Sequence, residues 1–305
     1  MISKLKYIFK VFIKELSNSP DYWHPNLISR NSDNSIYLKK YYLDFSPKGI
    51  YKFKTKEGIP ELIMNKKKVY FSITIFNYGL GLIDNLENDI DGIKKIKNIL
   101  KWTLANQELD GSWRNKYEVK VHNMTSGWTS AMGQGLGISF LCRCYNLNLI
   151  PHDVVSKHIE LARKFMFSNE LKYYYKDEFI LQEFSGTSES VLNGYVFAIY
   201  GLHDYFLFTG NRSYFNESIN TLANFIHEYQ FFNWSYYSLT KTHSSSFYHK
   251  LHIEMMDSLF HLTGEPVFNK QKRIWKRGLK FRIIYILNKS VQKLFKFNTI
   301  GELPE

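Results

Sequence analysis

The sequence predicts a globular protein with an all-α core, and three observations support this fold class. The chain has 305 residues, 44% of them hydrophobic, which suits a protein with a sizeable buried core. From about residue 73 onward, apolar side chains recur at spacings of three and four, as in amphipathic helices. Loops containing Gly, Asn and Asp separate these segments, and no long alternating strand lies between them. Helical hairpins packed in a ring or a layer would cover the apolar faces.

The chain divides into three predicted regions. Residues 1–72 begin with a basic amphipathic stretch and continue with short extended runs, so we expect a small irregular or β-containing region. Residues 73–270 carry the helical periodicity and form the main predicted domain. Residues 271–305 form a basic amphipathic tail, since ten basic and no acidic residues occur from Lys270 to Lys296. This segment accounts for most of the formal net charge of +12.

The charge distribution suggests partners at the two ends of the chain. Apolar residues interleaved with Lys and Arg are typical of a helix lying on an anionic membrane surface, although a solvated terminal helix explains the pattern equally well. No nucleic acid partner is expected, because no recognised motif accompanies the charge. Lysines interrupt every apolar run of the N-terminus, so we expect no cleaved signal peptide. The expected location is the cytoplasm, with contact at the inner face of its membrane.

The stretch SGWTSAMGQGLGISFL, residues 126–141, contains closely spaced glycines but does not predict a phosphate loop. Such a loop follows a buried strand, and the preceding sequence KVHNMTSGWTSAM lacks one. We expect Thr125 or Ser126 to cap a helix whose small residues allow close packing. Each glycine costs a helix about 1 kcal/mol relative to alanine, so the glycines indicate a packing constraint.

Several polar residues could carry chemistry. Glu183 precedes a helix predicted to start near Ser188, and a helix N-terminus favours an anion. Tyr237 and Tyr248 lie in a polar segment, where tyrosines by residue type alone act as hydrogen-bond donors. His249 and His252 have no partner at a convincing metal-ligand spacing, so no metal site is predicted.

Taken together, five blocks of sequence resemble the catalytic C-terminal domain of the D-glucuronyl C5-epimerase family. In chain order they are VYFSITIFNYGLGLIDN, WTLANQELDGSW, SGWTSAMGQGLGISFLCRCY, SESVLNGYVFAIYGLHDY and YYSL followed by FYHKLH. The resemblance covers about residues 70–262 and implies an incomplete (α/α) toroid. It also implies an epimerase that inverts C5 of a hexuronic acid, D-glucuronate to L-iduronate, in an acidic polysaccharide or lipid-linked glycan. No cofactor is implied, because the proton is exchanged directly.

The resemblance also implies the site residues. The family's catalytic Glu and Tyr correspond to Glu183 and Tyr248, with a second active-site tyrosine at Tyr237. We further expect six residues to contact the substrate: Trp128, Gln134, Asn193, Tyr195, Thr240 and Lys241. The family's carboxylate-binding Arg is replaced here by Thr240, so we expect the neighbouring Lys241 to neutralise the substrate carboxylate.

The sequence departs from the family pattern in ways that leave alternatives open. Phe184 stands where animal members carry Tyr, and the β-sandwich that large members insert is missing from the short interval between Ile83 and Ile99. A polysaccharide lyase would share the abstraction of the C5 proton but would expel the 4-linked sugar. A non-catalytic glycan-binding module would keep the cleft without turnover. A homodimer is also left open.

Overall fold

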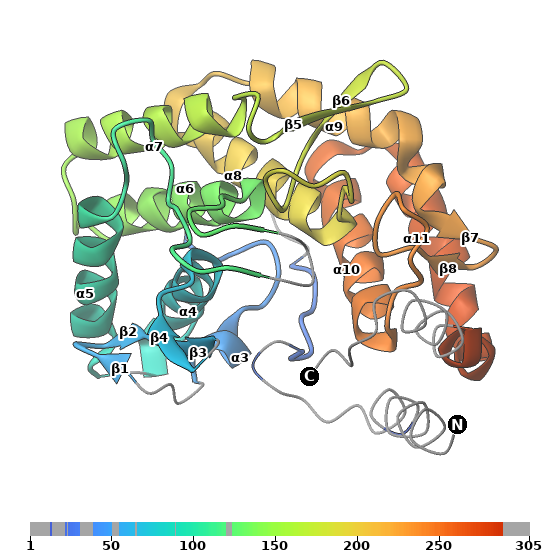
Figure 1. Ribbon diagram of the computed structural model, residues 1–305, viewed down its shortest axis with the longest axis horizontal. Helices are drawn as coiled ribbons and strands as arrows, with labels where there is room; N and C mark the ends of the chain where they lie inside the picture. Colours follow the sequence, from blue (N-terminus) through green and yellow to red (C-terminus); the bar gives the residue numbers. More distant parts are fainter. Residues whose placement is uncertain are drawn as a thin grey trace.

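The computed structural model describes residues 13, 22, 24–30, 39–50, 55–64, 66–88, 90–119 and 124–288. The described core is helical, as the sequence predicts (Figure 1). After the short helix α3 (Ser46–Gly49), the long helices follow one another as sequential pairs. The pairs are α4 (Ser72–Asp84) with α5 (Gly92–Ala105), α6 (Ala131–Asn146) with α7 (His152–Met166), α8 (Leu192–Thr209) with α9 (Ser213–Phe225), and α10 (Ser246–Thr263) with α11 (Pro266–Gly278). Short 3₁₀ turns lie at Leu86–Asn88, Ile226–Tyr229 and Leu279–Phe281.

The first helix of each pair lies inside and the second lies outside (Figure 1). Every residue of α4 is buried, and α6 and α8 are buried along most of their length. Their neighbours α5 and α7 bury a single face, at Ile96, Ile99 and Leu100 in α5 and at Val155, Ile159 and Ala162 in α7. In chain order, α4 packs against α6, α6 against α8, and α8 against α10, while each outer helix packs on its own partner. This order explains why only the outer helices show a clear polar face.

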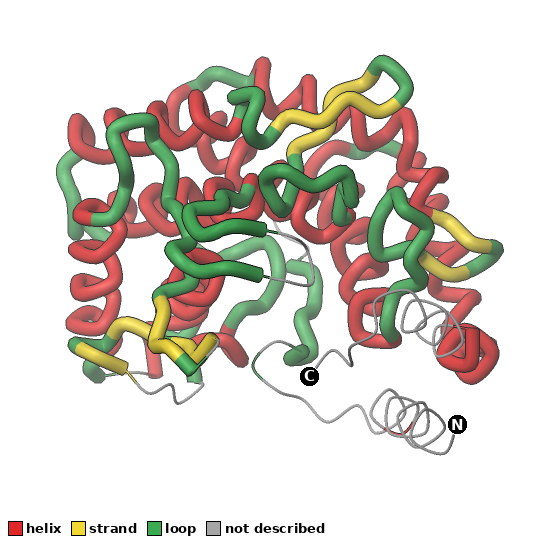
Figure 2. The backbone as a smooth tube through the Cα atoms, viewed as in Figure 1, coloured by secondary structure: helices red, strands yellow, loops and turns green. Residues whose placement is uncertain are grey.

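Strands occur only as short antiparallel hairpins among the described residues, and they lie at the edges of the helical core (Figure 2). In the N-terminal region β1 (Thr55–Lys56) pairs with β2 (Ile59–Pro60), and β3 (Leu62–Met64) pairs with β4 (Lys67–Val69). These agree with the β-containing region expected there. The hairpins β5 (Lys172–Tyr175) with β6 (Glu178–Leu181), and β7 (Gln230–Phe231) with β8 (Trp234–Ser235), lie within the helical region and were not expected.

The N-terminal region packs into the same core as the helices, so the predicted division at residue 72 is not a break in packing. Tyr41, Tyr42 and Phe45 are fully buried within the main cluster. The Tyr42 hydroxyl donates to Asp204 Oδ1 at 2.8 Å, and Asp204 itself forms a buried ion pair with Arg143. The basic stretch predicted for residues 1–20 lies outside the described residues, apart from position 13.

The predicted boundary at residue 270 falls inside α11, so it is wrong as a domain boundary. The Trp275 side chain is fully buried in the core, and residues 282–288 continue as a helix that buries Tyr285 and Ile286. The rest of the predicted tail, residues 289–305, lies outside the described residues. In the part of the chain that the structure describes, no helix is long and apolar enough to cross a membrane.

The glycine-rich stretch forms the start of α6, and its glycines permit close packing as predicted. The cap is Ser130 rather than Thr125 or Ser126, since Ser130 Oγ accepts from the Gly133 amide at 3.1 Å. A Cβ on Gly135 would meet the backbone of α8 at Phe197 O, and one on Gly137 would meet the indole of Trp113. The stretch therefore fixes the spacing of α6 against its neighbours.

Candidate active site

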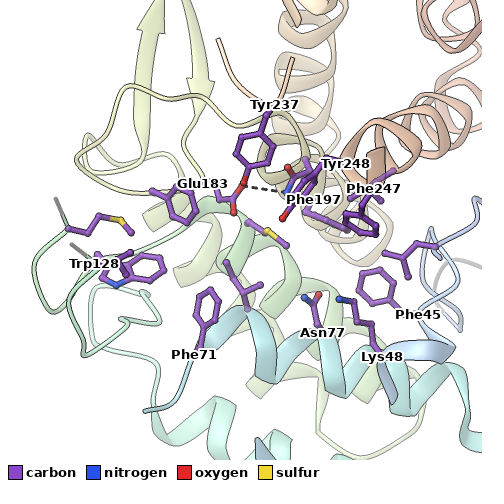
Figure 3. A pocket seen from close by; sticks show the side chains of 18 of the residues that line it. Phe45, Lys48, Phe71, Asn77, Trp128, Glu183, Phe197, Tyr237, Phe247 and Tyr248 are labelled. Carbon is purple, nitrogen blue, oxygen red and sulfur yellow. Dashed lines mark hydrogen bonds between the residues drawn. The ribbon is translucent and has the colours of Figure 1, made fainter. Parts of the chain in front are cut away.

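A pocket of about 250 Å³ opens where the inner helices meet the N-terminal region (Figure 3). The lining residues come from five parts of the described chain: positions 27, 45 and 48; 64, 71, 73 and 77; 117, 119, 124, 128 and 132; 183, 184, 193 and 197; and 237, 247, 248 and 251. Most of the lining is apolar or aromatic. Tyr117 and Trp128 belong to the aromatic part of the lining. Six further lining residues are polar or ionisable: Lys48, Asn77, Glu183, Asn193, Tyr237 and Tyr248.

Glu183 is held in the pocket by hydrogen bonds on both sides of it in the chain. On one side, Gln182 O accepts from the Ala131 amide at 2.9 Å, and the Gln182 amide side chain exchanges two hydrogen bonds with Ser190. On the other side, the Ser185 amide donates to Thr129 O at 3.0 Å. The loop that carries Glu183 is thereby tied to the N-terminus of α6 and to the segment that leads into α8. A carboxyl group on such a loop has a fixed position.

The surroundings of Glu183 favour its neutral form. The side chain is 6% exposed and packs against Gly194 in the first turn of α8. Asn193 Nδ2 donates a long hydrogen bond of 3.5 Å to Glu183 Oε2. Burial, followed by the negative charge of Glu189, raises the pKa of Glu183 to about 8. A carboxyl with this pKa can both donate and accept a proton near neutral pH.

Two tyrosines share the pocket with Glu183. Figure 3 shows the Tyr237 hydroxyl directed toward the Glu183 carboxyl group, with Tyr248 next to it. The two tyrosine rings meet edge to face, with their centroids 4.8 Å apart. Burial, and then the charge of Glu183, raises the pKa of Tyr237 well above its ordinary value. The structure thus brings together the three residues that the sequence nominated as catalytic.

The backbone explains why these tyrosines lie there. Tyr237 O accepts from the Leu192 amide at 3.0 Å, which joins this residue to the first turn of α8. Tyr248 lies in the first turn of α10, where its amide donates to the capping Ser245 Oγ at 3.2 Å. Tyr248 therefore lies at the N-terminus of α10, and the loop that carries Tyr237 is joined to the N-terminus of α8.

Aromatic rings form one wall of the pocket around Trp128. Trp128 contacts Phe71, Tyr117 and Phe184, with ring centroids between 5.6 and 5.8 Å apart. Phe184, which departs from the family pattern, is thus part of this wall. Flat aromatic faces suit the apolar faces of a sugar ring. The prediction that Trp128 lies at the binding site agrees with its place in the pocket lining.

Three lining residues carry a buried polar atom that has no hydrogen-bond partner among the described residues. These atoms are Asn77 Oδ1, Trp128 Nε1 and Asn193 Oδ1. An unpaired buried polar atom costs about 1–3 kcal/mol. A polar occupant that paired with these groups after small side-chain shifts would recover part of that free energy.

Lys241 and Thr240 do not line the pocket, contrary to the expected substrate contacts. The Lys241 side chain is 43% exposed, and its ammonium group donates to Glu228 O at 2.6 Å and to Glu228 Oε2 at 3.0 Å. Thr240 Oγ1 bonds Ser238 Oγ at 2.7 Å within the same turn. Glu228 also pairs with Lys176, so Lys241 belongs to an ion-pair network that holds this turn. In this structure Lys241 therefore faces Glu228 and not the pocket, where we expected it to meet the substrate carboxylate.

Gln134 and Tyr195 are also structural rather than pocket-lining. Both are buried in the helical core. Gln134 Nε2 donates to Gly111 O at 3.3 Å, which links α6 to the loop after α5. The Tyr195 hydroxyl donates to Ser218 O at 2.9 Å, which links α8 to α9. Their positions in the blocks that resemble the family reflect packing between helices.

Lys48 and Asn77 line the pocket and were missed from the sequence. Lys48 is only 4% exposed, and its ammonium group donates to Tyr22 O at 2.6 Å and lies 4.5 Å from the centre of the Tyr22 ring. Asn77 lies on α4, inside the quoted block VYFSITIFNYGLGLIDN, so its polar side chain in a buried apolar helix was a usable signal. Lys48 gave no such signal, because its segment SPKG reads as an ordinary turn.

The histidines considered as metal ligands are occupied by structural contacts. His249 Nδ1 accepts from the Ser235 amide at 3.1 Å, and its Nε2 lies 3.0 Å from Trp275 O. His252 Nδ1 lies 2.9 Å from Ser235 Oγ. Across the described ranges, no group of three or more His, Cys, Asp or Glu side chains is arranged to hold a metal ion.

Comparisons with known proteins identify the family. A protein of Methanocaldococcus jannaschii, described as uncharacterized, is 25% identical over 179 residues. The match covers 54% of this chain and 56% of that protein, so the chain spans little more than half the length of this relative. A family model described as the D-glucuronyl C5-epimerase C-terminus matches residues 107–277, which is more than half of the chain and includes Glu183, Tyr237 and Tyr248. The chain therefore belongs to the D-glucuronyl C5-epimerase C-terminal family.

Proposed function

We propose that this protein is an isomerase that inverts C5 of a hexuronic acid residue in a polysaccharide or a lipid-linked glycan. One observation carries the proposal: the buried Glu183 carboxyl lies next to two tyrosines, Tyr237 and Tyr248, in a pocket lined by aromatic rings. The family membership supports the reaction type, and D-glucuronate to L-iduronate is the conversion that it favours. The inner and outer helices also support the incomplete (α/α) toroid that the resemblance implies.

The reaction requires two proton-transfer groups on opposite sides of the sugar ring. The C5 hydrogen is next to the carboxylate carbon, so its removal leaves a carbanion with enolate character. Glu183 in its ionised form takes this proton, and Tyr248 supplies a proton to the other face of C5. Charge and atoms balance on the sugar, because one proton leaves C5 and one returns to it. Glu183 is left protonated and Tyr248 as a phenolate, and proton exchange with solvent returns both groups to their starting forms. Tyr237 assists by hydrogen bonding to the group that holds the abstracted proton.

The properties of the pocket suit this chemistry. Its mostly apolar lining provides a low-polarity environment, which strengthens electrostatic interactions with developing negative charge. An ordinary glutamate, with a pKa of about 4.3, is too weak a base for a carbon acid. The raised pKa of Glu183, about 8, makes its carboxylate a stronger base.

The decisive experiment is incubation of the full chain with uronic acid polymers in deuterated water. We expect deuterium at C5 and L-iduronate among the products, measured by NMR spectroscopy and mass spectrometry. Glu183→Gln keeps the shape of the side chain and removes the proton acceptor, so the rate of exchange should fall by about 10²-fold or more. Unchanged exchange in this variant would remove Glu183 from the mechanism, and no exchange with any hexuronan would contradict the proposal.

The same samples distinguish the two alternative functions. A lyase would produce an unsaturated uronate, seen as ultraviolet absorbance, together with shorter chains. A binding module would retain uronan without exchange at C5. Either result would replace the epimerase assignment.

A further inference from the structure

We propose that Lys48 forms the carboxylate-binding subsite of the pocket, with Asn77 beside it. The inference rests on the proposed function and extends it, because it names the cation that the reaction needs. Both residues precede residue 107, so they lie outside the part of the chain that the family model matches. The N-terminal segment would then complete the site that the matched helices begin.

The charges in the pocket lining favour Lys48 for this role. Among the lining residues, the side chains that ordinarily carry charge at neutral pH are Lys48 and Glu183. A hexuronate that enters the pocket brings a carboxylate, whose desolvation is costly unless a cation or donors receive it. Lys48 is the cation in the lining, whereas Lys241 is exposed and bonded to Glu228 outside it. An ammonium group can form a charge-assisted hydrogen bond with the carboxylate.

The position of Lys48 is fixed by a close contact between two helices. Lys48 lies on α3, and the next residue, Gly49, packs directly on Gly81 of α4. A Cβ on either glycine would fall on the backbone of the other. This contact holds α3 against α4, and Lys48 of α3 and Asn77 of α4 both line the pocket (Figure 3). Asn77 Oδ1, unpaired in the described part of the chain, is an acceptor for a sugar hydroxyl.

The proposed reaction needs a cation next to the substrate carboxylate. Negative charge develops on the carboxylate when the C5 proton leaves, so a cation at the carboxylate stabilises the transition state more than the ground state. Substitution of Lys48 should therefore reduce kcat as well as affinity. This distinguishes a subsite for the reacting sugar from a general attraction to polyanions.

The test compares two probes with the full chain. One is a tetrasaccharide of alternating D-glucuronate and N-acetyl-D-glucosamine, and the other is the same molecule with its carboxyl groups reduced to alcohols. We expect the wild-type protein to prefer the acidic probe by about tenfold or more in titration calorimetry, as for a hydrogen bond to a charged group. Lys48→Gln keeps a donor for Tyr22 O but removes the charge, so it should abolish the preference. Lys48→Arg should keep most of it.

Two further variants control for folding and for the rival lysine. Lys164→Gln changes an exposed lysine on the outer helix α7 and should behave as the wild type. Lys241→Gln should retain the preference, because Lys241 does not line the pocket. Retained binding of the neutral probe by Lys48→Gln shows that this variant is folded.

The inference is overturned if Lys48→Gln keeps the preference for the acidic probe, if Lys241→Gln loses it, or if the wild type shows none. Failure of the proposed function gives a different result. In that case the wild type shows a Lys48-dependent preference for the acidic probe but exchanges no hydrogen at C5.

A separate observation supports a second proposal, which does not depend on the first. We propose that the end of the described chain docks on an anionic lipid bilayer through a surface that we call the C-terminal apolar surface. It consists of Phe281, Ile283, Ile284 and Leu287, whose exposed fractions lie between 50% and 59%. The same helical segment buries Tyr285, which stacks on Trp234 with ring centroids 4.6 Å apart.

This helical segment is unusual because its outward side is apolar as well as its inward side. Residues 283, 284 and 287 share one helical face, at spacings of three and four. Exposed basic residues of α11 and the turn after it precede the surface in the chain: Lys270, Arg273, Lys276, Arg277 and Lys280. Like charges oppose self-association of two such surfaces, whereas each Lys or Arg contributes about 1 kcal/mol next to an anionic membrane. Apolar residues among basic ones are typical of interfacial helices.

The test uses flotation of the full chain with vesicles. Deletion of the segment is unsuitable, because it would also remove the buried side chains of Tyr285 and Ile286. We expect binding to vesicles of phosphatidylcholine mixed with phosphatidylglycerol, and little binding to phosphatidylcholine alone. Combined Ser substitutions at the C-terminal apolar surface should lower the binding at least about tenfold. The matched control carries Ser at four exposed apolar positions elsewhere, namely Ile63, Ile90, Leu109 and Phe232, and should bind as the wild type.

Equal binding by the substituted protein and the wild type would overturn this proposal. So would equal binding of the wild type to neutral and anionic vesicles. A dimer in sedimentation that the Ser substitutions dissociate would assign the surface to a second copy of the chain instead.

Discussion

Glu183 packs against Gly194, and the absence of a side chain at residue 194 is what lets the carboxyl group occupy the pocket. A Cβ at residue 194 would lie 2.5 Å from Glu183 Oε2 and would also overlap the rest of the side chain. Gly194 lies in the first turn of α8, which is buried. The glycine therefore couples the packing of an inner helix to the position of the proposed base.

Gly194→Ala should reduce kcat for C5 exchange by about 10²-fold, because a displacement of about 1 Å is enough to disrupt proton transfer. The substitution should also lower stability, since the added Cβ would lie 2.4 Å from Glu183 Cβ, so the exchange rate is compared per folded molecule. Gly137→Ala is the contrasting variant, because its Cβ would overlap the Trp113 indole, whereas the Cβ at residue 194 would overlap Glu183. It should lower the melting temperature while the folded fraction keeps its exchange rate. The reverse pattern in the two variants would contradict the role given to Gly194.

The pH dependence of exchange should report the ionisation of Glu183. Only the carboxylate form can accept the C5 proton, and the pKa of Glu183 is about 8. We therefore expect kcat/KM to rise with pH and to level off above an apparent pKa of about 8, which forms the acidic limb of the profile. The negative charge of Glu189 contributes to raising this pKa, so Glu189→Gln should move the limb to lower pH. A limb that does not move would show that another group controls the profile.

The sequence predicted the helices better than it predicted the site. The apolar periodicity at Ile96 and Leu100, and again at Ile159 and Ala162, corresponds to the buried faces of α5 and α7. This signal is local, because each outer helix has one buried face. It fails where the turn chemistry is unusual, as in the hairpin of β5 and β6. There Lys176 and Asp177 both adopt left-handed φ angles, of 50° and 66°, without the Gly or Asn that normally marks such a turn.

The site depended on the three-dimensional packing of distant segments. The resemblance nominated Glu183, Tyr237 and Tyr248, which share one pocket. We expected Lys241 next to the substrate because it follows Thr240, which occupies the position of the family's Arg. Lys241 instead lies at the end of a turn, with a left-handed φ of 61°, and its ammonium group pairs with Glu228. Lys48 could not be found, because its position follows from the contact of Gly49 with Gly81, two residues far apart in sequence.

Glu183 should also reduce the stability of the protein as the pH rises. Its pKa is raised from 4.5 to about 8 by folding, so between these values the folded state holds a proton that the unfolded state has lost. The free energy of unfolding therefore falls with increasing pH across this window. Glu183→Gln removes the effect, so its stability relative to the wild type should grow between pH 4.5 and pH 8, on the order of 1.4 kcal/mol for each pH unit crossed. Urea unfolding at several pH values measures this, and a difference independent of pH would contradict it.

The buried ion pair of Arg143 and Asp204 should be essential to the core that carries the site. Arg143 Nη1 lies 2.7 Å from Asp204 Oδ2, both side chains are almost completely buried, and the pair joins α6 to α8. Asp204→Asn leaves the guanidinium without its charged partner, so it should cost about 3–5 kcal/mol in urea unfolding. Arg143→Met combined with Asp204→Asn should cost less than the sum of the two single changes, because the double variant buries no unpaired charge. Lys116→Met, which removes an exposed pair with Glu108, is the control and should cost about 1 kcal/mol or less. Additive effects of the two core substitutions would show that the pair does not act as a unit.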